Sequence, residues 1–161
     1  MEDKASLLLV MGAMVIFSML LMNINKFLLQ NDTTQVGEQM NHTAAALSQG
    51  LIGIAKSKAF DQATVGGKYP QNVPTVFSAT LGPENGETPK NYDDFDDYNG
   101  YATTDTTSLG VFHLSVTVTY VSDTDFSQVS AIPTTHKRMT VDVYNPTMKD
   151  TLALTYIKSY Y

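Results

Sequence analysis

The chain has 161 residues, with ten basic and sixteen acidic side chains and a formal net charge of −6. Because binding to nucleic acid needs a clustered positive surface, this balance argues against a nucleic-acid partner. The sequence contains no cysteine, which excludes thiol catalysis, cysteine zinc sites, iron–sulfur clusters and covalently attached c-type haem. The length fits one domain of ordinary size plus an extra segment.

The first segment, residues 1–30, is dominated by apolar side chains. Between Ala5 and Met22, fifteen of eighteen residues are apolar and none is charged. As a helix this run is about 27 Å long, close to the hydrocarbon thickness of a bilayer. A secretory signal peptide starts with a basic region, whereas this chain starts Met-Glu-Asp-Lys. We therefore predict an apolar helix that lies in lipid or in a bundle of identical copies, rather than a removable signal.

Residues 31–62 continue the helix in amphipathic form. Apolar side chains recur at three- to four-residue spacing, which is the pattern of a helix with one buried face. They are Val36, Met40, Ala44, Leu47, Leu51, Ile54 and Ala55. The first proline is Pro70, so no residue of that type interrupts the helix earlier. We expect one helix that ends near residue 61 and packs its apolar stripe against a sheet.

The rest of the chain divides into a connection and a set of strands. Residues 63–110 are rich in glycine and proline and are predicted to be a connecting loop region, with at most short strands such as one around Thr75–Leu81. In residues 111–161, three runs alternate apolar and polar side chains and are rich in β-branched residues, namely Val111–Ser122, Lys137–Tyr144 and Thr151–Tyr160. The prediction is an α+β fold in which the helix packs on a three- to four-stranded antiparallel meander.

Sequence motifs for catalysis are absent. The three histidines are far apart, and neither G-x-S-x-G, H-E-x-x-H nor a phosphate-binding glycine loop occurs. We expect no enzymatic activity and no cofactor. The stretch from Glu84 to Asp105 holds seven carboxylates and one base, Lys90. A solvated acidic loop is the favoured interpretation, and the candidate ligands, should calcium bind there, are Asp94, Asp96 and Asp97.

This succession of segments resembles the type IV pilin and pseudopilin family. The stretch Asp93–Tyr101, which reads DDFDDYNGY, is similar to an acidic element of some minor pilins of the mannose-sensitive-haemagglutinin type. The last two predicted strands resemble the final hairpin of those proteins. The resemblance implies an inner-membrane precursor that moves into a helical polymer, whose core would contain Leu8, Gly12, Val15, Phe17, Leu21 and Phe27.

The family also implies a contact at the N-terminus during assembly. Its members lose a basic leader at a glycine and are methylated at the new N-terminus, and a glutamate at the fifth mature position pairs with a neighbour's terminal amine. This chain has Ala5 at that position and shows no leader. The resemblance implies that Glu2, with Asp3 as the alternate, pairs with the terminal amine of Met1 in a neighbouring copy. Residue 1 is expected to be either the processed terminus or the start of a chain that has no leader.

Three functional hypotheses follow from these features. The first is a structural subunit of an extracellular pilus-like filament on a bacterial cell surface, whose partners are copies of itself, the inner membrane before assembly and the pilus assembly machinery. The second is a minor pilin or a secretion-system pseudopilin. The third, from another class, is a membrane-anchored binding module that does not polymerise.

Overall fold

A computed structural model describes residues 2–161 of the chain, apart from the side chains of Glu2 and residues 28–34. The chain forms two compact units, Met1–Gln39 and Met40–Tyr161, and each is described by itself below. The elements, in chain order, are the helix α1 (Glu2–Lys56), the short 3₁₀ helices η1 (Gln62–Thr64) and η2 (Asp96–Tyr98), and the strands β1 (Ala102–Thr107), β2 (Gly110–Tyr120), β3 (His136–Tyr144) and β4 (Leu152–Ser159).

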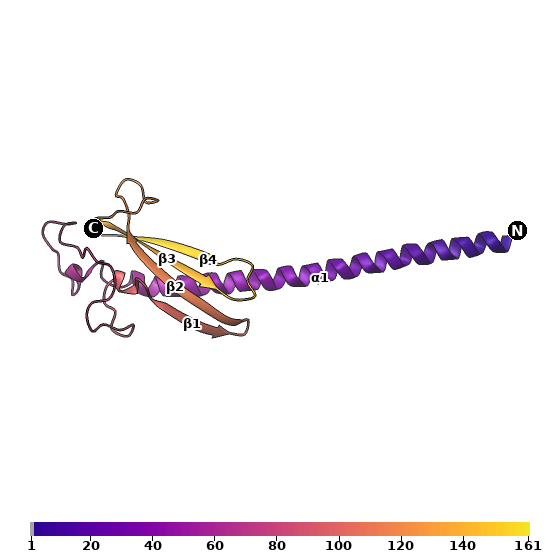
Figure 1. The fold of residues 1–161 in the computed structure, drawn as a ribbon, viewed down its shortest axis with the longest axis horizontal. Coiled ribbons are helices and arrows are strands. Elements are labelled where there is room, and N and C mark those ends of the chain that lie inside the picture. Colours follow the sequence, from indigo (N-terminus) through magenta and orange to yellow (C-terminus); the bar gives the residue numbers. More distant parts are fainter. Residues whose placement is uncertain (1) are drawn as a thin grey trace. The chain divides into compact units, whose positions relative to one another are not determined.

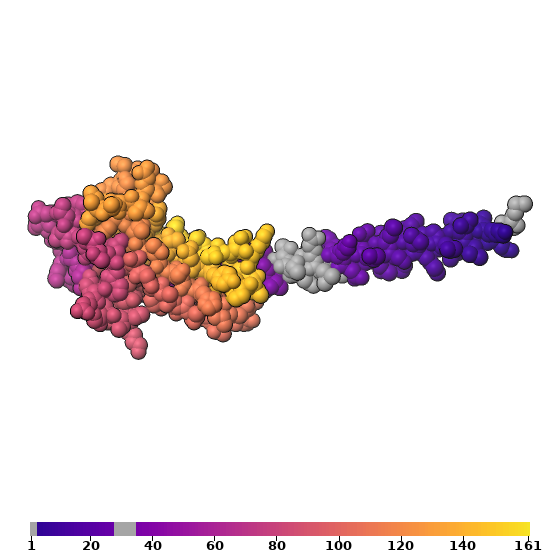
Figure 2. All heavy atoms as spheres, in the orientation of Figure 1, coloured from indigo at the N-terminus to yellow at the C-terminus, as the bar shows by residue number. Residues whose placement is uncertain are grey.

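The first unit contains the apolar part of α1. Its segment Asp3–Phe27 is long and apolar enough to cross a membrane, with a mean hydropathy of 2.4. Every described side chain between Asp3 and Phe27 is exposed, and Figure 2 shows this segment as a rod of atoms with no second layer around it. The predicted apolar N-terminal helix is therefore confirmed. An exposed apolar surface of this kind needs lipid or protein to cover it.

The second unit is built around one four-stranded antiparallel sheet. The strand order is β1-β2-β3-β4, so each strand pairs with the next one along the chain, as in a meander (Figure 1). In the central pair, Val116 lies opposite Val141 and Val118 lies opposite Met139. The last part of α1 runs along one face of this sheet. The predicted α+β fold with a C-terminal antiparallel meander is therefore confirmed.

The core lies between that part of α1 and the inner face of the sheet. The buried side chains of β2 and β3 occur at every second residue, because successive side chains of a strand point to opposite faces. They meet small and aliphatic side chains of the helix. The buried set includes Ala44, Ile52, Ala55, Phe112, Leu114, Val116, Val118, Met139, Val141 and Val143.

Two predictions about the helix need correction. The helix ends at Lys56 rather than near residue 61. Beyond it the chain turns away, and the backbone of Ala59 forms a β-bridge with Asp94 in the acidic segment. The buried stripe also differs at both of its ends, since Val36 and Ile54 are exposed, whereas Ser48 and Ile52 are buried. The Ser48 hydroxyl donates to the Ala44 carbonyl oxygen, which lets a polar side chain lie on the buried face.

The connection between helix and sheet also differs from the prediction. Residues 75–81 form turns and bends rather than a strand, whereas β1 lies inside the region predicted to be a loop. Strand β1 reads ATTDTT and is largely exposed on both faces at the edge of the sheet. Because it has no alternation of apolar and polar residues, periodicity could not detect it.

Candidate functional site

The acidic segment Asp93–Asp97 folds around its own carboxylates. Asp94 Oδ1 accepts hydrogen bonds from the backbone nitrogens of Asp96 (2.9 Å) and Asp97 (3.2 Å). In return, Asp97 Oδ2 accepts from the backbone nitrogens of Asp93 (2.8 Å) and Asp94 (2.9 Å). Carboxylates that accept from free backbone donors stabilise the start of a helical turn, here η2. Asp94, Asp96 and Asp97 are all fully buried, so the interpretation as a solvated acidic loop is wrong for these three residues.

A buried lysine neutralises part of this acidic region. The Lys137 ammonium is fully buried and donates to Asp61 Oδ2 (2.7 Å), to the Phe60 carbonyl oxygen (2.9 Å) and to Asp96 Oδ1. Lys137 lies on the core face of β3, two residues before Met139 in the same alternation. Buried ions persist only when they are paired and hydrogen-bonded, and here all three ammonium protons have an acceptor.

Asp61 connects this lysine to other parts of the second unit. The Tyr120 hydroxyl on β2 lies 3.2 Å from Asp61 Oδ2 and 2.9 Å from the Ser78 carbonyl oxygen. Asp61 also caps η1, accepting from the backbone nitrogen of Ala63 (3.1 Å). Burial, followed by the nearby Asp61 charge, raises the pKa of Tyr120. One aspartate therefore joins η1, the loop around Ser78, β2 and β3.

A second inward-facing lysine caps the helix. Lys158 on β4 lies directly opposite Lys137 in the sheet register and donates to the carbonyl oxygens of Lys56 (3.2 Å), Lys58 and Ala59 (3.0 Å). Lys56 is the last residue of α1, and Lys58 and Ala59 follow it directly, so the ammonium lies at the C-terminal end of the helix, where positive charge is favourable. Burial lowers the pKa of Lys158 from its ordinary 10.5 to about 8.

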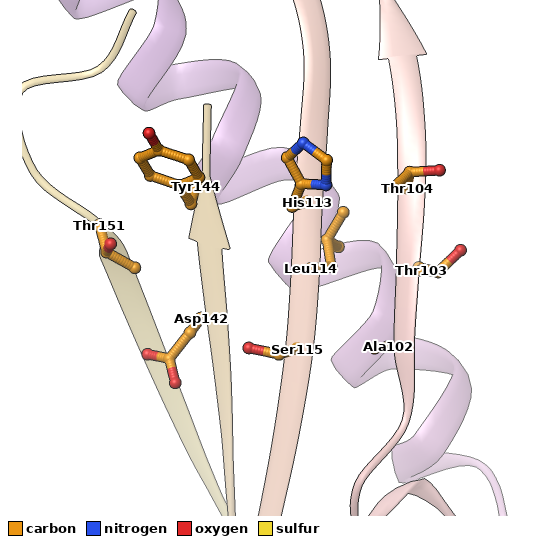
Figure 3. Close-up of a pocket in the computed structure, with 9 residues that line it drawn as sticks. All are labelled: Ala102, Thr103, Thr104, His113, Leu114, Ser115, Asp142, Tyr144 and Thr151. Carbon is orange, nitrogen blue, oxygen red and sulfur yellow. The ribbon is translucent and has the colours of Figure 1, made fainter. Parts of the chain in front are cut away.

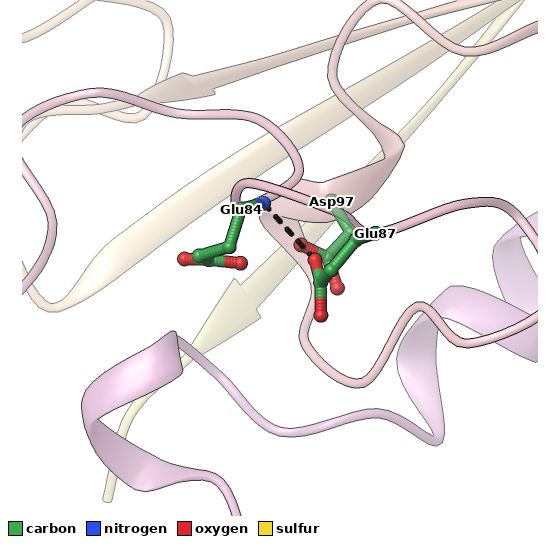
Figure 4. Close-up of side chains that lie close together, drawn as sticks. All are labelled: Glu84, Glu87 and Asp97. Atoms are coloured by element: carbon green, nitrogen blue, oxygen red, sulfur yellow. Dashed lines mark hydrogen bonds between the residues drawn. The ribbon is translucent and has the colours of Figure 1, made fainter.

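A separate group of carboxylates takes part in none of the ion pairs that the described residues form. Figure 4 shows the side chains of Glu84, Glu87 and Asp97 close together. Each brings one carboxylate oxygen to within 4.8 Å of the other two. Glu87 Oε2 also accepts from the Glu84 backbone nitrogen at 3.0 Å. Burial and the hydrogen bond with Glu87 raise the pKa of Glu84 to about 7. The arrangement is three oxygen donors at a spacing that one divalent cation can span.

The predicted calcium ligands do not form one site in the described part of the chain. Of Asp94, Asp96 and Asp97, the structure brings only Asp97 to a group that could hold a metal. Asp96 is turned to Lys137, and Asp94 is occupied by backbone donors. The partners of Asp97 are instead Glu84 and Glu87, from the loop that precedes the motif.

The outer face of the sheet carries a shallow hollow of about 680 Å³. Its lining includes His113, Ser115 and Asp142, and Figure 3 shows Ser115 and Asp142 side by side on neighbouring strands. The described hydrogen bonds include none among these three side chains, and the His113 ring stacks instead on Tyr144, with centroids 6.3 Å apart. A serine nucleophile needs a hydrogen-bonded base, so this arrangement does not activate Ser115.

The predicted filament-core residues lie on the exposed helix of the first unit. Leu8, Val15, Phe17, Leu21 and Phe27 are between 46% and 71% exposed. A shallow apolar hollow of about 600 Å³ follows one side of this helix, where small residues alternate with large ones; it is lined by Ala5, Leu8, Leu9, Gly12, Ala13 and Ile16.

The predicted N-terminal charge contact is described only in part. Asp3 is exposed, whereas Met1 and the side chain of Glu2 lie outside the described residues. The assembly role of these three residues stays a prediction.

Sequence reasoning named Asp94, Asp96 and Asp97 but missed the buried Lys137 and Asp61. Lys137 could have been found, because it continues the two-residue period of Met139 and Val141 on the core face. Asp61 and Glu87 carried no local signal, since their partners are far away in the sequence or in another loop.

Comparisons with known proteins identify no relative of this chain. The chain matches no protein-family model, no curated protein and no solved structure. The functional argument therefore rests on the residues and geometry described above.

Proposed function

We propose that this chain is a structural subunit of a type IV pilus-like filament on a bacterial cell surface. The apolar helix would first anchor the chain in the inner membrane and would then pack with identical helices in the filament core. The sheet-containing units would form the outside. The observation that carries the proposal is the exposed, uncharged surface of Ala5–Met22, followed in the chain by a folded unit that covers its own core.

A bundle of identical helices would cover the apolar surface of Ala5–Met22 just as effectively as lipid does. Small residues allow two helix backbones to approach closely, and a Cβ atom added at Gly12 would meet nothing within 4 Å in this chain. The hollow around Gly12 thus offers space that a neighbouring helix can occupy. A simple membrane anchor has no need of such a face, because lipid tails conform to any apolar surface.

The first experiment is to identify the dominant protein in filaments sheared from the cells that make this chain. Intact-mass measurement should give the mass of residues 1–161, with one added methyl group if the terminus is processed. A dominant filament protein of another mass, with this chain in the membrane fraction, would favour a minor subunit or an anchor.

A pair of substitutions separates assembly from anchoring. Gly12→Leu keeps the helix apolar, so membrane insertion should be unchanged, but the larger side chain should block close packing and abolish filaments. The matched control is Ala46→Leu, which makes a similar enlargement at an exposed position of the helix in the second unit. A Gly12→Leu strain with normal filaments would contradict the proposed core contact.

A charge substitution tests the same surface more severely. Leu8→Asp or Val15→Asp should abolish filaments, because a buried carboxylate in an apolar bundle has no partner. Ile132→Asp places the same charge at an exposed apolar position of the second unit and should leave filaments intact. The non-polymerising module predicts instead a monomer in detergent, and filaments that persist in all three variants.

A further inference from the structure

The buried Lys137 amine lies against two carboxyl groups in a site that is closed to solvent. Its Nζ atom donates to Asp61 Oδ2 at 2.7 Å and to Asp96 Oδ1, and these three side chains are at most 1% exposed. The rings of Phe60 and Tyr120 lie over the amine, with centroids 4.7 Å and 5.2 Å from Nζ. An amine and a carboxyl group held together in this way can react with an effective concentration of about 10⁵–10⁸ M.

The two carboxyl groups differ in the hydrogen bonds that they accept. Asp61 Oδ1 accepts from the backbone nitrogen of Ala63 (3.1 Å) and Asp61 Oδ2 accepts from that of Ser78 (3.1 Å), and such donors stabilise a carboxylate. Asp96 Oδ1 accepts from Lys137, whereas Asp96 Oδ2 is buried without a hydrogen-bond partner among the described residues. Burial raises the pKa of Asp96. Asp61 is therefore suited to accept a proton, and Asp96 is suited to react as a neutral acid.

A third aspartate can supply a proton to Asp96. Asp94 Oδ2 is a second buried acceptor that receives no hydrogen bond from the donors of the described residues. Burial, followed by the Asp96 charge, raises the pKa of Asp94 to about 8, so Asp94 holds a proton at neutral pH. A hydrogen bond between the two carboxyl groups raises this pKa further. The proton of Asp94 thus provides the donor that Asp96 Oδ2 lacks.

We propose that the Lys137 amine and the Asp96 carboxyl group condense to an isopeptide bond, a self-catalysed modification of this chain. Nζ bonds to Cγ of Asp96, the bond from Cγ to Oδ2 breaks, and two protons of Nζ leave with Oδ2 as one water molecule. Asp61 accepts the first proton from Nζ, and Asp94 relays protons to the leaving oxygen. A final proton transfer from Asp61 to Asp94 restores both groups. No co-reactant is needed, and the ion pair is the starting state.

The bond would cross-link a chain that has no cysteine and therefore no disulfide. Asp96 in η2 and Lys137 on β3 are 41 residues apart. A cross-link across such a loop restricts the unfolded chain, as a disulfide does, and an amide cannot be reduced. It also replaces two buried charges by one amide, which is less costly to bury. This inference does not depend on filament assembly, but the filament mass expected above would fall by one water molecule.

The test is the intact mass of the full chain, purified in detergent and then unfolded in denaturant. The wild-type chain should have the mass of its sequence less one water molecule. Because an aspartate that cyclises to a succinimide also loses water, the link has to be mapped. Chymotrypsin cleaves after Phe112 and Tyr120, which lie between the two reacting residues. The fragments that contain Asp96 and Lys137 should stay joined after this cleavage.

Substitutions assign the roles of the amine and the base. Lys137→Arg keeps a cation but has no primary amine, so this variant should have the full mass. Asp61→Asn removes the base and should slow bond formation at least about 100-fold, which leaves most chains at the full mass. The matched control is Lys158→Arg. Lys158 faces inward opposite Lys137, but it donates to carbonyl oxygens, so this variant should lose water as wild type does.

Near-UV circular dichroism of tyrosine establishes that each chain measured is folded. A folded wild-type chain with the full mass would overturn the proposal. A loss of water that persists in Lys137→Arg, or that maps to other residues, would overturn it as well. A folded Asp61→Asn chain that links as fast as wild type would overturn the assignment of Asp61 as the base.

Discussion

Replacing Lys137 by methionine tests the central polar contact of the second unit. Methionine keeps the length and apolar bulk of the side chain but removes the ammonium, which has hydrogen bonds to Asp61, Asp96 and the Phe60 carbonyl oxygen. Two aspartates with 1% exposed side chains would then face each other without a cation. Removing one partner of a buried ion pair destabilises a protein by about 3–5 kcal/mol.

The measurement is urea unfolding of the full chain in detergent, followed by near-UV circular dichroism of tyrosine. All nine tyrosines lie at or after Tyr69, so the signal reports on the second unit alone. With a slope of about 2 kcal/mol per molar urea, a loss of about 4 kcal/mol lowers the midpoint by about 2 M. Lys90→Met, at an exposed position, should change the stability by less than about 0.5 kcal/mol.

A double variant identifies the cause of the loss. In the Lys137→Met background, Asp96→Asn removes one of the two stranded charges, so the pair should be less destabilised than the sum of the single variants by about 0.5–3 kcal/mol. The reasoning is refuted if Lys137→Met alone lowers the stability by less than about 1 kcal/mol, because the aspartates would then be solvated or neutral.

Three further outcomes follow from the same region. Tyr120→Phe should destabilise the unit by about 1–2 kcal/mol in urea unfolding, because Asp61 Oδ2 and the Ser78 carbonyl oxygen share the one hydroxyl proton of Tyr120 and would lose it. An unchanged midpoint would mean that water replaces this donor. Phe95→Ala should cost about 3–5 kcal/mol, because this ring is fully buried, and a loss below 1 kcal/mol would contradict its place in the core. For Lys158 the folded pKa of about 8 lies below the ordinary 10.5, so the unfolded chain binds more protons between these values and the contribution of Lys158 to stability should rise with pH there. The measurement is the unfolding free energy of wild type and of Lys158→Met from about pH 7 to about pH 9.5. The difference between them should shift in favour of wild type by at most about 1.4 kcal/mol per pH unit. A difference that does not change with pH would show that the pKa of Lys158 is not lowered.

The elements that local patterns specify could be predicted from the sequence. The apolar run Ala5–Met22 is long and uncharged enough to allow few alternatives, and the alternation in β2 and β3 marks the buried face of each strand. Strand β1 was not predicted because its sequence has no alternation of apolar and polar residues. It is a strand because its backbone pairs with β2. Ile52 rather than Ile54 lies on the buried face because it continues the four-residue spacing of the buried Ala44 and Ser48 along one side of the helix.

The candidate sites depended more strongly on tertiary structure. Composition alone determined that residues 84–105 are acidic, but not whether those charges face water, protons or cations. Lys137 meets Asp61 across 76 residues and Asp96 across 41, and Glu84 and Glu87 reach Asp97 only when their loop folds over η2. A sequence pattern records the period of an element and therefore predicts which face is buried. The identity of the partners on that face is set by chain segments distant in sequence, and only the folded chain brings them within the few ångströms over which charges and hydrogen bonds act.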